Sequence, residues 1–142
     1  MRIAQRTLLT AMIGIVILLV INVYENSVEK LRGQWEVLQI QRFMSKAVRN
    51  RKIEKLGYET CTTSLNYYGV GSELKIEEYR KEEDITSNSY YSLISFEEIR
   101  EELFESGEFF FRPGSVIKVT VCRNTGKGGS RNEYFDLIPE EG

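Results

Sequence analysis

An uncharged run of 18 residues, TLLTAMIGIVILLVINVY, occupies positions 7–24 of a 142-residue chain. Charged residues make up 28% of the whole sequence, so this run is a sharp local exception. As an α-helix it would be about 27 Å long, close to the ~30 Å hydrocarbon core of a bilayer. A small domain cannot surround a helix that is apolar on every face, and no small-x-small cleavage site of a secretory signal follows. The run therefore predicts one transmembrane helix, or a helix buried among similar helices.

The charges that flank this run predict its orientation in a membrane. Residues 1–6, MRIAQR, form a short basic leader with two arginines and no acid. The positive-inside rule then places the N-terminus in the cytoplasm and a domain at 58–142 outside. A second basic cluster lies too far along the chain to weigh strongly on this orientation. Its members, which we expect to make charge contacts between subunits, are Arg42, Lys46, Arg49, Arg51, Lys52 and Lys55.

No proline occurs before Pro113, so the helix can continue beyond the membrane. An apolar seam with heptad spacing follows the run and then shifts by two residues to Ile40, Phe43, Met44, Ala47 and Val48. We expect one helix over about 5–56, amphipathic over 25–56 and ending at Gly57. Its stripe either packs on the following domain or mediates self-association. The residues predicted to pack helix against helix are Ile13, Ile17, Val20, Val28, Leu31, Trp35 and Leu38.

The remaining residues, 58–142, have the texture of a small β-rich domain. Thr- and Tyr-rich or alternating segments predict strands at 60–68, 72–77, 116–122 and 133–138. A capping box at Ser95 and Glu98 predicts a short helix over 96–105, which Gly107 ends. The predicted fold is α+β: a long N-terminal helix followed by a small antiparallel sheet or sandwich with one short helix.

The two cysteines, Cys61 and Cys122, both fall in predicted strands. In a domain outside the cell they predict one disulfide, whereas in a cytoplasmic domain they would be two free thiols. The chain has no histidine, the usual general base and the commonest metal ligand. We therefore expect no catalytic residues, metal, cofactor or small-molecule substrate. The net charge of −2 also argues against a nucleic-acid partner.

Charge is segregated along the chain. Residues 42–55 carry six cations and one acid, a net charge of +5, whereas residues 73–108 carry twelve acids and four cations, a net charge of −8. These segments could lie against each other within one molecule. Between molecules they would give the head-to-tail complementarity that builds open arrays.

A basic leader, an apolar helix, its amphipathic continuation and a β domain together resemble the type IV pilin-like superfamily. The segment Arg2-Ile3-Ala4-Gln5 is similar to a class III leader, which would be cleaved after Ala4. The segment 111–119, FRPGSVIKV, is similar to a pattern in archaeal β domains of this kind. The resemblance implies a structural protein of a pilus or archaellum, partnered by the membrane and by its own or other pilin-like subunits. If the leader is kept, it implies an anchored accessory component. The alternative from the residues alone is a single-pass small subunit or tether of a cell-envelope complex.

Overall fold

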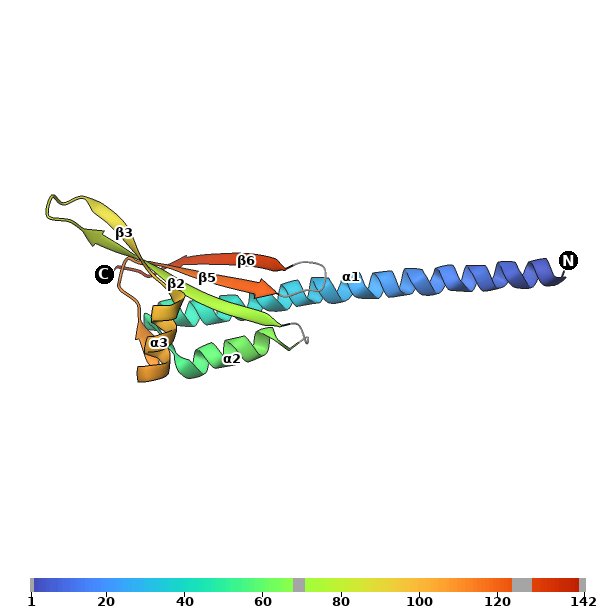
Figure 1. Ribbon diagram of the computed structural model, residues 1–142, viewed down its shortest axis with the longest axis horizontal. Coiled ribbons are helices and arrows are strands. Elements are labelled where there is room, and N and C mark those ends of the chain that lie inside the picture. Colours follow the sequence, from blue (N-terminus) through green and yellow to red (C-terminus); the bar gives the residue numbers. More distant parts are fainter. Residues whose placement is uncertain (1, 68–70, 124–128, 141–142) are drawn as a thin grey trace. The chain divides into compact units, whose positions relative to one another are not determined.

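The computed structural model describes residues 2–67, 71–123 and 129–140. The chain divides into two compact units, Met1–Glu36 and Val37–Gly142, and each is described by itself. The fold is α+β, as the sequence predicts, with one long N-terminal helix, antiparallel sheets and short helices (Figure 1). In chain order the elements are α1 Arg2–Asn50, β1 Lys52–Glu54, α2 Lys55–Leu65, β2 Ser72–Glu83, β3 Ser89–Ile94, α3 Phe96–Ser106, β4 Glu108–Phe110, β5 Val116–Arg123 and β6 Ser130–Leu137.

The first unit is a continuous stretch of helix α1. Its few polar side chains satisfy themselves within the helix: the hydroxyl of Thr7 donates to the carbonyl of Ile3 at 2.9 Å, and that of Thr10 to the carbonyl of Arg6 at 2.8 Å. Hydrogen bonds of this kind to the residue four positions earlier hide the polarity of a hydroxyl. The helix therefore tolerates both threonines in an apolar environment.

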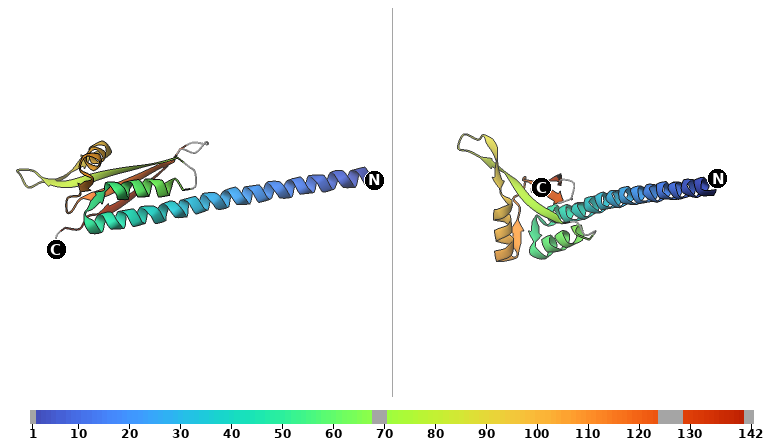
Figure 2. Two further views of the ribbon diagram at one scale, coloured as in Figure 1. Left: turned by 90° about the horizontal axis from the view of Figure 1, so that it is seen from below. Right: turned by 45° about the vertical axis from the view of Figure 1, so that its right-hand side comes forward.

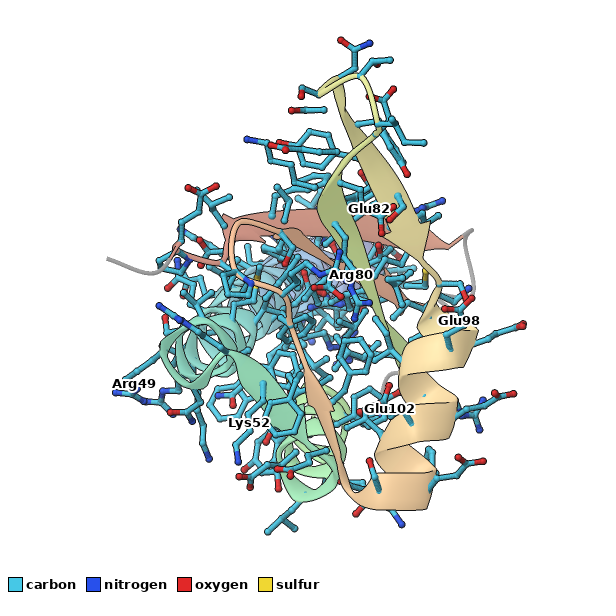
Figure 3. All side chains as sticks on the ribbon, turned by 90° about the vertical axis from the view of Figure 1, so that its left-hand side faces the viewer. Arg49, Lys52, Arg80, Glu82, Glu98 and Glu102 are labelled. Carbon is cyan, nitrogen blue, oxygen red and sulfur yellow. The ribbon has the colours of Figure 1, made fainter. Side chains whose placement is uncertain are left out.

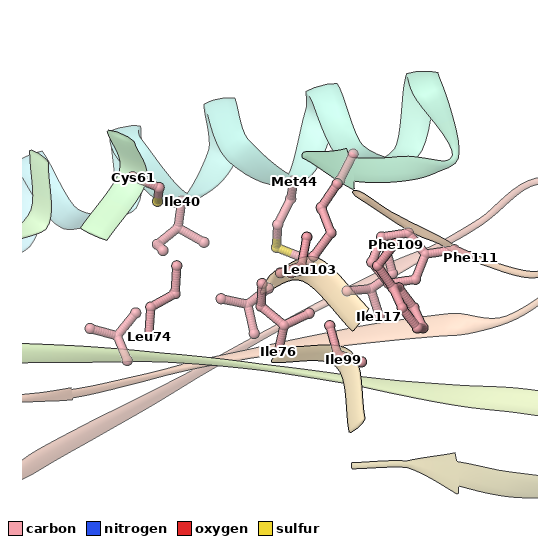
Figure 4. Packing of buried hydrophobic residues seen from close by; sticks show 14 of the residues in the cluster. Ile40, Met44, Cys61, Leu74, Ile76, Ile99, Leu103, Phe109, Phe111 and Ile117 are labelled. Carbon is pink, nitrogen blue, oxygen red and sulfur yellow. The ribbon is translucent and has the colours of Figure 1, made fainter. Parts of the chain in front are cut away.

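The second unit is built on a four-stranded antiparallel sheet with the order β3-β2-β5-β6. Alternate residues of β2 and β5 are buried, because successive side chains of a strand point to opposite faces. On one face, Leu74, Ile76 and Ile117 pack with Ile40 and Met44 of α1 (Figure 4). The alternation that predicted strands at 72–77 and 116–122 is thus the pattern of a half-buried sheet, and both predictions are confirmed.

The predicted short helix is also confirmed as α3. The hydroxyl of Ser95 accepts a hydrogen bond from the backbone N–H of Glu98 at 3.4 Å, and Gly107 ends the helix with a φ of 85°. After α3, the short strand β4 pairs with β1 in a second, two-stranded sheet. A turn follows in which the N–H of Ser115 donates to the carbonyl of Arg112 at 3.1 Å. Gly114 has a φ of 82° there, which a turn of type II requires at that position.

The long helix ends at Asn50 rather than at about residue 56. Arg51 has a φ of 56°, the left-handed conformation that often follows a helix end. The chain then enters β1, which pairs with β4 (Ile53 opposite Phe109). Gly57 lies inside α2 and is therefore not the stop that we predicted.

The strand predicted at 60–68 is wrong, because residues 55–65 form α2. The threonines of this segment have strand propensity, but Cys61 and Leu65 lie one helical turn apart and are both buried. The hydroxyl of Thr62 donates to the carbonyl of Tyr58 at 2.9 Å, which satisfies this polar group within the helix. Packing of this face against the core therefore overrides local propensity.

The sheet has two further features that the sequence did not indicate. The strand β3 pairs with the far end of β2, from Glu78 to Glu83, while β5 pairs with β2 only as far as Tyr79. The β2–β3 hairpin therefore extends past β5 as a two-stranded arm (Figure 2). The last strand, β6, contains residues 133–137 of the segment predicted at 133–138 and begins earlier, at Ser130. The turn expected around 124–130 lies mostly outside the described residues.

Candidate membrane anchor and assembly surfaces

The apolar run 7–24 is exposed along its whole length. Every residue of it is classed as exposed, and none of its most apolar 18-residue window is buried. The predicted packing residues Ile13, Ile17 and Val20 are 52%, 53% and 62% exposed. Full exposure of so many aliphatic side chains to water is unfavourable by about 25 cal/mol per Å². By length and composition this helix could span a membrane, and lipid or other apolar helices would cover it.

The amphipathic continuation of α1 contributes to the core through the later apolar residues, from Ile40 onward, and not through the earlier ones between Val28 and Leu38. Ile40, Met44 and Ala47 are almost fully buried in the second unit, whereas Leu38 is 40% exposed. Leu31 is 50% exposed, and Val28 and Trp35 are half-buried. The interpretation in which the apolar stripe packs on the following domain therefore holds for Ile40, Met44 and Ala47.

The predicted basic cluster is divided by the structure. Lys52 lies 3.0 Å from a carboxylate oxygen of Glu108, and the hydrogen bond to this acid raises the pKa of the Lys52 amine. The amine of Lys55 lies 4.8 Å from the centre of the Phe104 ring. These cations are thus engaged within the chain. Arg51 also has an interaction in the structure.

Three cations of that cluster instead form an exposed basic stripe on α1, made of Arg42, Lys46 and Arg49. Their spacing of four and three residues places them on one side of the helix, opposite buried Ile40 and Met44. No acid occurs between positions 37 and 50. Within the described part of the chain, none of the three forms an ion pair.

An acidic face occupies the exposed side of α3. It consists of Glu97, Glu98, Glu101, Glu102 and Glu105, all exposed and without an ion pair among residues 2–67, 71–123 and 129–140. Like charges four residues apart destabilise a helix slightly. In Figure 3, Arg49 and the pair Glu98 and Glu102 project from different sides of the second unit. One molecule therefore does not pair its basic stripe with its own acidic face.

The two cysteines are free thiols in this structure, so the disulfide that we expected is not formed. Cys61 lies in helix α2, not in a strand, and is buried, while Cys122 lies on β5 and is partly exposed. Burial raises the pKa of the Cys61 thiol to about 12.

These environments predict that the two thiols differ in reactivity. Only a thiolate attacks a maleimide rapidly, and at pH 8 a thiol with a pKa of about 12 is about 0.01% thiolate. We expect one fast-reacting cysteine, Cys122, in the folded chain and two after denaturation, counted by mass spectrometry. Fast labelling of Cys61, abolished by Cys61→Ser and not by Cys122→Ser, would contradict this assignment. If the cysteines were labelled only after reduction, the result would support the disulfide between Cys61 and Cys122 that the sequence predicts.

Within the described residues, no group of three or more His, Cys, Asp or Glu side chains could hold a metal ion. The features that stand out are instead surfaces: the apolar run, the basic stripe and the acidic face. Comparisons with known protein families, curated proteins and solved structures found no match to this chain. The function is therefore argued from these surfaces.

Proposed function

We propose that this chain is a single-pass membrane-anchored assembly protein. The observation that carries the proposal is the run 7–24, which is uncharged and wholly exposed, while the second unit has a hydrophobic core of its own. A hydrophobic helix of this length is stable in a bilayer, where its backbone is internally hydrogen-bonded. The second unit is the part that reaches partners, and the basic leader holds the N-terminus in the cytoplasm.

The natural cysteines test the topology of the unmodified chain. Cys122 is partly exposed and Cys61 is buried, so a membrane-impermeant maleimide reports mainly on Cys122. After mild reduction of intact cells, we expect this reagent to label the chain without lysis. If the chain is labelled only after lysis, the second unit lies in the cytoplasm. The variant Cys122→Ser measures the background labelling.

The second candidate, a pilin-like filament subunit, is favoured by the basic stripe and the acidic face. Arg42, Lys46 and Arg49 span about 10.5 Å along α1, at about 1.5 Å per residue. Glu98, Glu102 and Glu105 have the same spacing of four and three residues on α3. The stripe of one subunit can therefore face the acids of the next. Contacts of this head-to-tail kind propagate without closing.

In a filament the charges would set the register, and the apolar helices would supply most of the free energy. Exposed ion pairs contribute about 0.2–1 kcal/mol each, whereas burial of one large aliphatic side chain contributes about 1.5–3 kcal/mol. Processing by a prepilin-type peptidase would remove residues 1–4. The intact mass of chain taken from native membranes tests this, because a mass that begins at Met1 favours the permanent anchor.

Reversing the basic stripe should weaken any head-to-tail assembly. We expect Arg42→Glu with Lys46→Glu to reduce sedimentable polymer severalfold, because like charges would then face each other. Raising the salt concentration should weaken the wild-type assembly in the same direction, since exposed charges are screened. The control is Lys30→Glu, an exposed cation of α1 outside the stripe. Equal effects of the control and the stripe variant would contradict a specific role for the stripe.

A further inference from the structure

The face of the four-stranded sheet that points away from the core carries an apolar row across all four strands. Tyr79 of β2 lies opposite Leu93 of β3 on one side and opposite Val116 of β5 on the other, and Val116 lies opposite Leu137 of β6. Directly opposed residues of antiparallel strands share one face. Leu93 and Leu137, at the ends of this row, are 50% and 56% exposed.

Two aromatic residues widen the row into a band. Phe135, 59% exposed, is two positions before Leu137, and Tyr91, 58% exposed, is two positions before Leu93. Both therefore point to the same face as the row. The opposite face carries the buried residues Leu74, Ile76 and Ile117. Contiguous exposed apolar area of this kind marks an interaction site.

The charges around the band balance one another. Glu77 of β2 lies opposite Lys118 of β5, and the amine of Lys118 lies 3.4 Å from a carboxylate oxygen of Glu133. A nucleic acid or an anionic lipid surface gains little from such a face, because both require excess cations. The charged residues of this face are the four acids Glu73, Glu77, Glu83 and Glu133 and the four bases Lys75, Lys81, Lys118 and Arg131.

We propose that this face binds the same face of a second copy of the chain. A two-fold axis parallel to the strands, between β2 and β5, places Tyr79 on Val116 of the second copy. The same axis places Leu93 on Leu137 of the second copy. Tyr79 thus meets the smaller Val116, and two leucines meet at each end of the row, so the facing side chains are apolar throughout.

The same two-fold axis makes the central charges complementary. Glu77 and Lys118 are opposed across the axis within one sheet, so each meets the other type in the second copy. This gives two symmetric ion pairs between the copies, the self-complementarity that an isologous interface needs. All residues of this proposed contact belong to the second unit.

The size of the face indicates a weak interface. Four strands spaced by about 4.8 Å and a strand of eight residues define a face of about 19 by 27 Å. Two such faces bury about 1,000 Å², the lower limit for a specific contact. Anchoring both copies in one membrane would raise their effective concentration. The contact goes beyond the proposed function, which requires no particular surface of the sheet.

Cysteine cross-linking tests this contact on the full chain in membranes. In a Cys122→Ser background, Leu93→Cys with Leu137→Cys should give a covalent dimer with a short bifunctional thiol reagent, because facing sheets lie about 10 Å apart, beyond the reach of a direct disulfide. Within one chain the two positions are separated by three strand spacings, about 14 Å, and a bridge between them would give no dimer. The control, Leu56→Cys with Tyr90→Cys, presents two exposed positions off this face. Dimer yield no higher than the control, or cross-linking to a different protein instead, overturns the proposal.

Charge reversal then distinguishes contacts between copies from contacts within one copy. In the cross-linking background, Glu77→Lys alone and Lys118→Glu alone should each lower the dimer yield severalfold. A mixture of the two variants should restore it, because the side chain introduced by Glu77→Lys in one copy then meets the side chain introduced by Lys118→Glu in the other. Within each variant the in-register pair stays like-charged, so the mixture cannot act by repairing the fold. No recovery in the mixture contradicts the two-fold arrangement. Loss of membrane anchoring, measured separately, would overturn only the proposed function.

Discussion

A variant of the chain with both Ile13→Lys and Ile17→Lys should no longer insert into the membrane. Each lysine near the centre of an apolar helix costs about 2.5–3.5 kcal/mol of apparent insertion free energy. The run contains eleven Leu, Ile and Val residues, each of which contributes about −0.3 to −0.6 kcal/mol on the same scale. Two lysines therefore cancel or reverse the favourable insertion free energy of the whole run. We expect most of the variant in the soluble or aggregated fraction after flotation.

The matched control is Ile13→Leu with Ile17→Leu, which keeps the hydrophobicity and helix length of the run. It should float with the lipid as the unmodified chain does. If the lysine variant also floated with lipid, the run would not be the element that holds the chain in the membrane. Thermal unfolding of the second unit should be the same in both variants, because both positions lie in the first unit.

Replacing Glu78 by alanine should strongly destabilise the second unit. The Glu78 side chain is fully buried, and its two oxygens accept hydrogen bonds from the Nε of Arg80 at 2.7 Å and from the backbone N–H of Arg112 at 2.8 Å. The variant leaves Arg80 without its carboxylate and a backbone donor unsatisfied. The Arg80 side chain is 24% exposed and regains water, so the main loss comes from the unsatisfied backbone donor, about 1–3 kcal/mol, and the emptied space beside it adds to this. Chemical denaturation of the full chain in mild detergent, followed by near-UV circular dichroism, measures the loss.

Two further variants separate charge from shape at this position. Glu78→Gln keeps an acceptor for the N–H of Arg112 but loses the charge that faces Arg80, so we expect an intermediate loss. Glu82→Ala removes an acid four positions along the same strand. Its contact to Arg112 is long, at 3.5 Å, and exposed. This variant should cost under about 1 kcal/mol. Equal losses for Glu78→Ala and Glu82→Ala would show that the buried pair does not hold β2 to the turn before β5.

The sequence predicts those parts of the fold that depend on local pattern. The apolar run, the alternation in β2 and β5, and the cap formed by Ser95 and Glu98 each express a preference of a few neighbouring residues. The helix α2 was missed because Thr and Tyr favour strands, and only its contacts with the core select a helix. The strands β1 and β4 have three residues each, too few to show a period.

The surfaces depend on register, which one sequence does not reveal. The basic cluster reads as six equivalent cations, yet the fold pairs Lys52 with Glu108 and leaves Arg49 exposed. The apolar row of the sheet joins two pairs of consecutive strands, β2 with β3 and β5 with β6, that are far apart in sequence from each other. Its alignment follows from hydrogen bonding between strands, such as the pairing of Tyr79 with Val116. Neither the row nor the hydrogen bond from the backbone N–H of Arg112 to Glu78 has a local signal.

Alkaline extraction of native membranes that contain the unmodified chain tests the membrane-anchor proposal most directly. Carbonate at high pH releases proteins held by charge or by contact with other proteins, whereas a helix spanning the hydrocarbon core remains with the lipid. We expect the chain to stay in the pellet and to float with lipid on a density gradient, with Ile13→Lys/Ile17→Lys absent from that fraction. Quantitative release of the unmodified chain into the supernatant would contradict anchoring by residues 7–24.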